Sequence, residues 1–295
     1  MLTYTMIDSD AALASLLVSW KETGITSVAM DFEGEFNLHI YGEHLCLIQL
    51  FDGSAYYLVD PFKVSKEALQ DFLEDKSLEK VMFDCASDSA LVRKQYDILM
   101  EGLYDIRVLA LALGYTGNLS GLVERYIPEY VKPSGVSKKK NQMTNWLLRP
   151  LKDEQIQYAL SDVEHLFTLR SLLFEEVNKK GLAHDVAHQM QEVGKSKGVD
   201  KPGWMKFSSW KYLSKEEKVF LKHFFIARDT LARKYNVPAV RILEKHLLLQ
   251  MAKDVPATDV DFHIYCSKCS PKRLAELTSA LKQAKQDAIS ELGRA

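Results

Sequence analysis

The chain has 295 residues, of which 47% are hydrophobic, 26% charged and 10% aromatic. This composition is that of a globular protein and excludes a disordered chain, a collagen and a coiled coil. The net charge of −2 hides an asymmetry: residues 1–200 hold 20 Lys and Arg against 30 Asp and Glu, whereas residues 201–295 hold 18 against 10. An acidic body with a basic tail fits metal-binding carboxylates in one part and contacts to a polyanion in the other, although random drift of surface charge gives the same pattern.

The sequence predicts a cytoplasmic protein in a reducing compartment. No stretch approaches the roughly 18 apolar residues of a membrane span, and residues 1–20 carry Asp8 and Asp10 instead of a basic segment followed by an apolar run. Four cysteines are too few for a disulfide framework in a chain of this length.

Up to about residue 182, apolar strands alternate with segments of helical spacing. Strands are predicted at residues 27–33, 44–51, 55–60 and 80–84, and the second and third of these form a hairpin around Asp52-Gly53-Ser54. Helices are predicted at residues 11–21, 65–73, 87–96, 106–113 and 153–177. Strands mixed with intervening helices indicate an α/β domain over residues 1–182.

The remainder of the chain differs in composition. Residues 183–202 are polar and lose their periodicity, which predicts a linker. Helical spacing then covers residues 215–236, 239–253 and 271–289. The pattern predicts a small all-α domain over residues 203–295.

Four acidic positions and one tyrosine suggest chemistry. Asp31 and Glu33 lie at i and i+2 of a strand and so share a face, Asp88 opens a helix, and Tyr158 and Asp162 share a face at i and i+4 of another helix. Each pattern alone also occurs at ordinary strand ends and helix first turns. Carboxylates that converge repel one another unless cations neutralise them, and Mg²⁺ or Mn²⁺ prefers such oxygen ligands. Periodicity does not show whether these acids converge.

The sequence around these acids resembles that of the DEDDy class of 3′–5′ exonucleases, and within it the ribonuclease D family. The three motifs are MDFEGEF, KVMFDCASDSALVRKQY and NWLLRPLKDEQIQYALSDVEHL, in the family's order. The tail stretches WMKFSSWKYLS and ARDTLARKYNVPAVRILEKHLLLQMAKDVP resemble an HRDC domain, a small helical module that binds nucleic acid or protein. The resemblance implies a ribonuclease H-like mixed-sheet exonuclease domain followed by a small all-α HRDC-like domain.

The resemblance also implies a reaction: metal-dependent 3′–5′ hydrolysis of RNA with release of nucleoside 5′-monophosphates, tRNA 3′ processing being one such task. It implies two divalent ions, Mg²⁺ or Mn²⁺. Asp31 would bridge both ions, Glu33 and Asp162 would complete the first site, and Asp88 would hold the second. Tyr158 would orient the attacking water, which makes Asp31, Glu33, Asp88, Tyr158 and Asp162 the expected catalytic residues.

The sequence departs from the family in two respects, and two other functions compete with this interpretation. Phe83 and Asp84 precede Asp88 where relatives often have His-Gly or His-Asn, and the chain has room for one HRDC copy where some relatives have two. A DNA exonuclease of the same fold would use the same residues. A non-catalytic nucleic-acid or protein adaptor is disfavoured because all four acids are present.

The RNA 3′ end is the expected partner, and several side chains are candidates to contact it. Lys140 matches a lysine common in the family, although a lysine run is also an ordinary solvated surface, and Tyr41 follows the first motif. In the tail, Arg228, Arg233, Lys234 and Arg241 are candidates for a face that binds the phosphate backbone, with an Arg228–Asp229 ion pair as the structural alternative. Cys266 and Cys269 form C-x-x-C, which suggests zinc or redox chemistry, but a zinc site needs two more ligands and His263 is only one candidate.

Overall fold

The computed structural model describes residues 2–129, 143–195 and 201–293. The chain forms two compact units. The first comprises Met1–Glu35 with Glu43–Ser196, and the second comprises Phe36–Gly42 with Lys197–Ala295. The predicted division into an α/β part and a helical tail therefore corresponds to two separately packed bodies, apart from the short segment Phe36–Gly42 that groups with the second.

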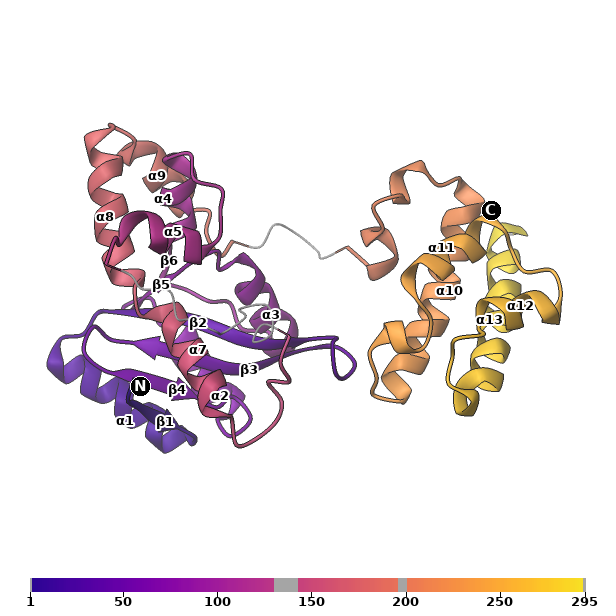
Figure 1. Ribbon diagram of the computed structural model, residues 1–295, viewed down its shortest axis with the longest axis horizontal. Coiled ribbons are helices and arrows are strands. Elements are labelled where there is room, and N and C mark those ends of the chain that lie inside the picture. Colours follow the sequence, from indigo (N-terminus) through magenta and orange to yellow (C-terminus); the bar gives the residue numbers. More distant parts are fainter. Residues whose placement is uncertain (1, 130–142, 196–200, 294–295) are drawn as a thin grey trace. The chain divides into compact units, whose positions relative to one another are not determined.

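A six-stranded mixed sheet forms the centre of the first unit (Figure 1). Its spatial order is β1-β4-β3-β2-β5-β6. β3 pairs antiparallel with β4, as the predicted hairpin requires, whereas β1 with β4, β2 with β5 and β5 with β6 are parallel pairs. The strands are β1 (Tyr4–Ile7), β2 (Ser27–Phe36), β3 (Glu43–Phe51), β4 (Tyr56–Val59), β5 (Glu79–Met82) and β6 (Leu103–Asp105).

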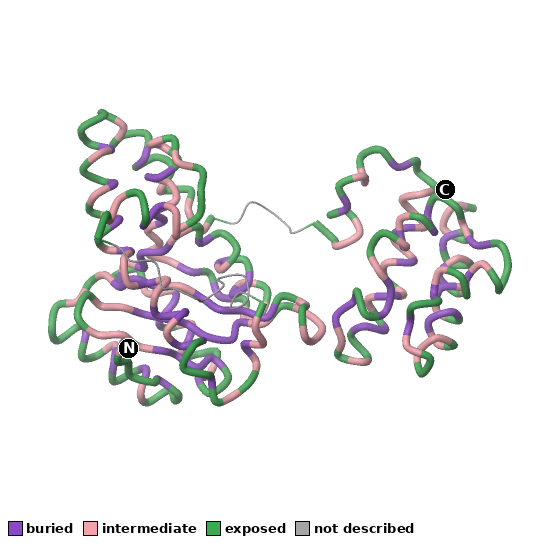
Figure 2. Tube along the Cα trace, viewed as in Figure 1, coloured by how far each residue is buried: buried purple, intermediate pink, exposed green. Residues whose placement is uncertain are grey.

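The two edge strands were not predicted from the sequence. β1 has four residues and β6 has three, so neither is long enough to show a clear alternation of apolar and polar side chains. The interior strands β2 and β3, by contrast, contain long runs of buried residues (Figure 2). Strands in the middle of a sheet are covered on both faces and therefore carry the strongest sequence signal.

Helices cover the sheet and extend beyond its β6 side. α4, α5, α8 and α9 pack together, as Figure 1 shows, around one apolar cluster. The described helices of this unit are α1 (Asp10–Thr23), α2 (Lys66–Leu73), α3 (Ala86–Tyr96), α4 (Ile106–Ala112), α5 (Leu119–Tyr126), α7 (Asp153–Val163), α8 (Leu166–Lys179) and α9 (Ala183–Met190).

The single helix predicted over residues 153–177 is wrong, because the structure has two helices there. Ile156 and Leu160 of α7 join the apolar cluster that lies against β3. Leu169 and Leu173 of α8 pack instead in the cluster with α4 and α9. The two halves bury their apolar faces in different places, so one straight helix cannot satisfy both.

The start of the predicted linker is also helical. Residues 183–190 form α9, and Val186 is only 5% exposed within the cluster that α8 and α4 share. Because most of this segment is polar, one buried valine gave too little periodicity to reveal a helix.

The second unit is all-helical, as predicted. Its core contains fully buried leucines of α10, α11 and α13 together with Phe224. The predicted helix 239–253 is divided into a 3₁₀ turn and α11. The elements are η1 (Gly203–Lys206), η2 (Trp210–Tyr212), α10 (Lys215–Lys234), η3 (Ala239–Arg241), α11 (Lys245–Lys253), α12 (Asp259–Tyr265) and α13 (Pro271–Gly293). Within the described ranges, no helix has the length and apolar character needed to cross a membrane.

Candidate active site

Three carboxylates from two distant elements meet beside the sheet. Asp31 and Glu33 project from β2, and Asp162 comes from α7. Each offers one oxygen, and these oxygens all lie within 4.8 Å of one another. The structure therefore brings together the acids of the first and third sequence motifs, which residue spacing alone could not connect.

The three carboxylates make an all-oxygen donor set for a hard divalent cation. Glu33 is 9% exposed, and burial raises its pKa well above the usual range, with the charges of Asp31, Asp162 and Asp88 adding to the shift. Buried like charges at this separation destabilise a fold in the absence of a counterion. The all-oxygen donor set, the burial of Glu33 and the mutual repulsion of the three carboxylates therefore fit a divalent metal.

Asp88, the acid of the second motif, lies in the first turn of α3. Burial, followed by the charges of Asp84 and Asp105, raises the pKa of Asp88 to about 7. Asp105 accepts hydrogen bonds from the backbone N–H groups of Asp84 at 2.7 Å, Cys85 at 3.2 Å and Arg107 at 2.8 Å. It thereby fixes the turn from β5 into α3, in which Asp84 has a positive φ of 62°. Asp88 stands apart from the cluster of three, but its charge reaches Glu33.

Tyr158 lies on α7 one turn before Asp162 and is 9% exposed. Its pKa is raised first by burial and then by the charges of Asp162, Glu33 and Asp31, together with its hydrogen bond to Asp162. The hydroxyl therefore keeps its proton throughout the neutral range and can donate it in a hydrogen bond. The ring of Trp146, 1% exposed, packs beside Tyr158 with the ring centroids 6.2 Å apart.

Gln49 supports the cluster and was not identified from the sequence. It is fully buried on β3, and its Nε2 donates to Oδ2 of Asp31 at 3.3 Å. Among the residues that the structure describes, its own Oε1 has no hydrogen-bond partner, which is costly for a buried amide and leaves an acceptor free beside the carboxylates. The available signal was a single amide within an otherwise apolar strand, because such a residue needs a polar partner once buried.

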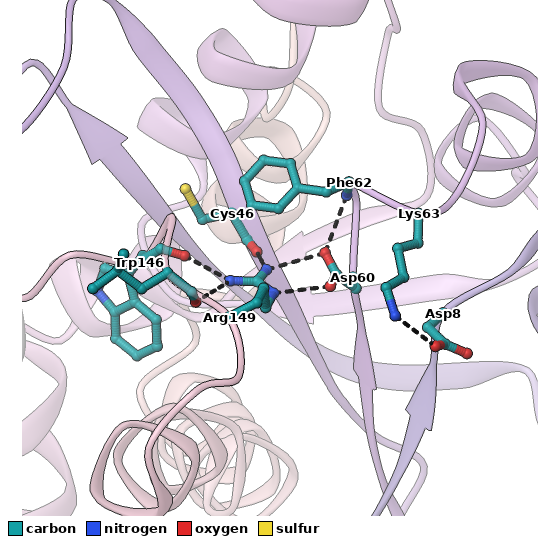
Figure 3. A network of polar contacts seen from close by, with 8 residues as sticks. Asp8, Cys46, Asp60, Phe62, Lys63, Trp146 and Arg149 are labelled. Carbon is teal, nitrogen blue, oxygen red and sulfur yellow. Dashed lines mark hydrogen bonds and ion pairs between the residues drawn. The ribbon is translucent and has the colours of Figure 1, made fainter.

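A second support, around Arg149, was likewise missed. Figure 3 shows the Arg149 guanidinium between the Asp60 carboxylate and the main-chain oxygens of Cys46 and Trp146. These bonds tie the segment that precedes α7 to β3 and to the end of β4. The segment includes Trp146, so the network also holds the side chain that packs against Tyr158.

Tyr41 and Arg233, two of the predicted nucleic-acid contacts, bind each other. Tyr41 lies in the segment Phe36–Gly42 of the second unit, and its hydroxyl donates to Oδ2 of Asp229 at 2.5 Å. Nη2 of Arg233 donates to the Tyr41 hydroxyl at 3.3 Å, and the guanidinium lies 5.5 Å from the ring centroid. Both side chains therefore have partners within the protein.

The other predicted basic contacts do not form one exposed face. Arg228 is only 6% exposed, its guanidinium lies 4.7 Å from the Phe225 ring centroid, and burial lowers its pKa. Lys234 pairs with Glu276 at 2.5 Å. Arg241 is exposed on η3, and Lys140 lies outside the described residues.

Comparisons with known proteins agree with this geometry. A family described as 3′–5′ exonuclease matches residues 4–178, and the HRDC domain family matches residues 217–268. The chain is 25% identical over 284 residues to Ribonuclease D of Nitrobacter hamburgensis, covering 94% of this chain and 69% of that protein. It is 32% identical over 184 residues to Ribonuclease D of Escherichia coli, covering 61% of this chain and 46% of that protein.

The fold has a counterpart among solved structures. The crystal structure of Escherichia coli RNase D matches with a TM-score of 0.72 at 24% identity, covering 96% of this chain and 76% of that one. The chain spans only part of the length of the curated Ribonuclease D relatives that it matches, between 46% and 69% for four of them. The exonuclease match covers more than half of the chain and contains all five residues of the site. The chain therefore belongs to the 3′–5′ exonuclease family, with a hydrolytic exonuclease domain followed by an HRDC domain.

Proposed function

We propose that this protein is a metal-dependent 3′–5′ exoribonuclease of the ribonuclease D type. It releases nucleoside 5′-monophosphates from the 3′ ends of RNA, with tRNA precursors as a candidate substrate. The observation that carries the proposal is the convergence of Asp31, Glu33 and Asp162 within 4.8 Å in a chain of the exonuclease family. The choice of RNA over DNA is supported by the relatives named Ribonuclease D.

We assign two divalent ions, Mg²⁺ or Mn²⁺, to this site. Asp31, Glu33 and Asp162 would hold one ion, and Asp31 with Asp88 would hold the other. Two bound divalent ions supply Lewis-acid chemistry, which lowers the pKa of water and stabilises negative charge on the leaving oxygen of a phosphodiester. The ionised carboxylates of the cluster supply the electrostatic attraction for them; burial first, and then the charges of Asp31, Asp162 and Asp88, raise the pKa of Glu33, and a bound cation would relieve this cost.

The protein's own groups position the reactants. Tyr158 keeps its proton at neutral pH and hydrogen-bonds the attacking water, which holds that water in line with the scissile bond. Gln49 orients Asp31 through the bond to Oδ2. Asp105 holds the turn that carries Asp88.

The division of labour follows the two units. We assign hydrolysis to the exonuclease domain, residues 1–182 together with the helix α9 that packs against it, and retention of RNA to the HRDC-like domain, residues 203–295. All four cysteines are free thiols, which supports the assignment of the protein to the cytoplasm.

Degradation of matched oligonucleotides tests the choice of substrate. Two single strands of the same sequence, one RNA and one DNA, are incubated with the protein and Mg²⁺ or Mn²⁺, and the release of 5′-monophosphates is followed over time. We expect faster release from RNA. A strong preference for DNA would overturn the ribonuclease assignment and favour a DNA exonuclease built on the same site.

A further inference from the structure

Aromatic and basic side chains alternate at the start of the second unit. Trp210, Lys211 and Tyr212 form η2, and Lys215 and Lys218 lie in the first turns of α10. Tyr212 is 77% exposed, which is an unusual position for a large aromatic side chain. These five residues are called the lysine–aromatic surface below.

The lysines lie next to the rings. Nζ of Lys211 is 4.8 Å from the ring centroid of Tyr212, and Nζ of Lys218 is 5.8 Å from that of Trp210. Lys215 and Lys218 are three residues apart on α10 and so project from the same side of that helix. Positive charge is thus concentrated around two aromatic side chains, one of them largely open to solvent.

Two other lysines of α10 have acidic partners. Lys222 pairs with Glu291, and Lys234 pairs with Glu276. Within residues 2–129, 143–195 and 201–293, by contrast, no carboxylate forms an ion pair with any of the lysines of the lysine–aromatic surface. Their charge is therefore available to an external anion.

We infer that the lysine–aromatic surface binds single-stranded RNA upstream of the 3′ end, an inference that rests on the proposed function. A base stacks on Tyr212, which has the exposed ring that stacking needs, and Lys211, Lys215 and Lys218 contact the phosphates on either side. Open aromatic rings with neighbouring cations are the combination by which proteins hold single strands without reading their sequence. This assigns RNA retention to η2 and the start of α10, whereas the face predicted from the sequence comprised Arg228, Arg233, Lys234 and Arg241.

Binding of RNA to the full chain tests this inference. Fluorescence anisotropy with a labelled 20-nucleotide single-stranded RNA is measured in chelator, so that no hydrolysis occurs, for the wild type, Tyr212→Ala and the triple variant K211Q/K215Q/K218Q. Loss of one stacked base weakens binding about 5- to 100-fold, which is the expectation for Tyr212→Ala. Loss of three phosphate contacts makes the slope of log affinity against log salt shallower by about 2 for the triple variant.

Matched controls separate this surface from a general effect of charge. K253Q/K268Q/K282Q removes three charges elsewhere in the same unit, and Ile264→Ala truncates another exposed apolar side chain, 65% exposed on α12. Both controls should bind RNA as the wild type does. Wild-type affinity in Tyr212→Ala and in the K211Q/K215Q/K218Q variant would overturn the inference and leave a protein partner as the ligand of this surface.

A second readout keeps this inference distinct from the proposed function. Hydrolysis of a four-nucleotide RNA with Mg²⁺ or Mn²⁺ needs only the exonuclease domain, so Tyr212→Ala should hydrolyse it at the wild-type rate. Failure of the wild type to hydrolyse this short RNA would contradict the proposed function, whereas the binding comparison would still decide the role of Tyr212.

Discussion

The guanidinium of Arg149 binds the carboxylate of Asp60 through two hydrogen bonds, from Nε to Oδ2 at 2.8 Å and from Nη2 to Oδ1 at 3.0 Å. Asp60 is 4% exposed, so the pair is largely shielded from water on that side. The same guanidinium donates to the carbonyl oxygens of Trp146 at 2.8 Å and Cys46 at 2.6 Å (Figure 3). With the carbonyl oxygen of Leu148 at 3.0 Å, the planar fork of five N–H donors serves four acceptor groups at once, which the three donors of a lysine ammonium cannot do. The pair thereby fixes the position of Trp146 beside Tyr158.

Arg149→Lys should therefore reduce both stability and activity. Loss of the paired geometry lowers the free energy of unfolding by about 2 kcal/mol, as expected for charge-assisted bonds to partly buried groups. Trp146 then shifts from its position, so that Tyr158 is held less firmly. This change lowers kcat more than it changes KM. Denaturant unfolding measures the first effect and steady-state hydrolysis of a short RNA measures the second.

A double-mutant cycle with Tyr158→Phe shows whether Arg149 acts through Tyr158. If it does, Arg149→Lys lowers kcat much less in the Tyr158→Phe background than in the wild type. If Arg149→Lys lowers kcat by the same factor in both backgrounds, the hydrogen bonds of Arg149 contribute to stability alone. The exposed pair Lys63–Asp8, 3.0 Å apart in the same view, provides the control: Lys63→Ala should change stability by less than about 1 kcal/mol and leave kcat unaltered.

Tyr158→Phe tests the role of the tyrosine hydroxyl directly. The variant keeps the ring that packs against Trp146 and removes only the hydroxyl, which hydrogen-bonds Asp162 and to which we assign the positioning of water. We expect kcat to fall by about 10²-fold, near the low end of the range for positioned proton-transfer groups, with little change in KM. Single-turnover hydrolysis of a labelled RNA separates this effect from product release. Wild-type kcat in this variant would remove Tyr158 from the mechanism.

Glu33→Gln should make the protein more stable without metal and should reduce the stabilisation that metal provides. In chelator, the variant lacks one buried carboxylate of a mutually repelling cluster. Its free energy of unfolding should therefore be about 1 kcal/mol higher than that of the wild type, and it should unfold at a higher temperature. With Mn²⁺ added, the wild type gains stability through binding, and the variant gains little because it has lost a ligand. Thermal unfolding with and without Mn²⁺ measures both effects. Equal stabilisation of the two proteins by Mn²⁺ would place the metal elsewhere.

The stability of the protein should depend on pH through Asp52, a residue outside the group of metal ligands. Burial alone would raise its pKa, but hydrogen bonds from the backbone N–H groups of Ala55 and Ser54, both at 2.8 Å, and from the hydroxyls of Tyr57 and Ser54 lower it overall. A carboxyl group with a lower pKa in the folded state stabilises the fold above its unfolded pKa of about 3.9, and this contribution is lost as the pH falls through the folded pKa.

The unfolding temperature of Asp52→Asn should accordingly differ most from that of the wild type at neutral pH. The difference stays constant between about pH 5 and pH 7, and it shrinks as the pH drops below about 4. Thermal unfolding at pH 7, 5, 4 and 3 in chelator measures it. A difference of the same size at pH 3 and pH 7 would contradict the hydrogen-bonded, ionised state of Asp52.

The sequence predicted the elements whose apolar pattern is long. The hairpin of β3 and β4 and the helices α10 and α13 of the second unit belong to this class. β1, β6 and the break between α7 and α8 do not, because short edge strands lack periodicity and the break depends on two separate packing surfaces.

The candidate site divides in the same way. Asp31, Glu33, Asp88, Tyr158 and Asp162 were recognisable because motifs carry them. Gln49 and Arg149 were not, because their partners Asp31 and Asp60 lie 18 and 89 residues away and only the folded sheet brings them together. Arg228 shows the opposite error: a basic residue on a helix was expected at the surface, yet it packs over Phe225 in the interior.

Shortening of a 5′-labelled single-stranded RNA by the full chain tests the central claim most directly. The reactions contain Mg²⁺, Mn²⁺ or chelator, with Asp88→Asn as the matched variant, and a gel resolves each nucleotide. We expect a ladder that shortens from the 3′ end with metal, no product in chelator, and loss of turnover but retained RNA binding for Asp88→Asn. Absence of cleavage with both ions by folded wild-type protein, or equal cleavage by Asp88→Asn, would contradict a metal-dependent exoribonuclease built on these carboxylates.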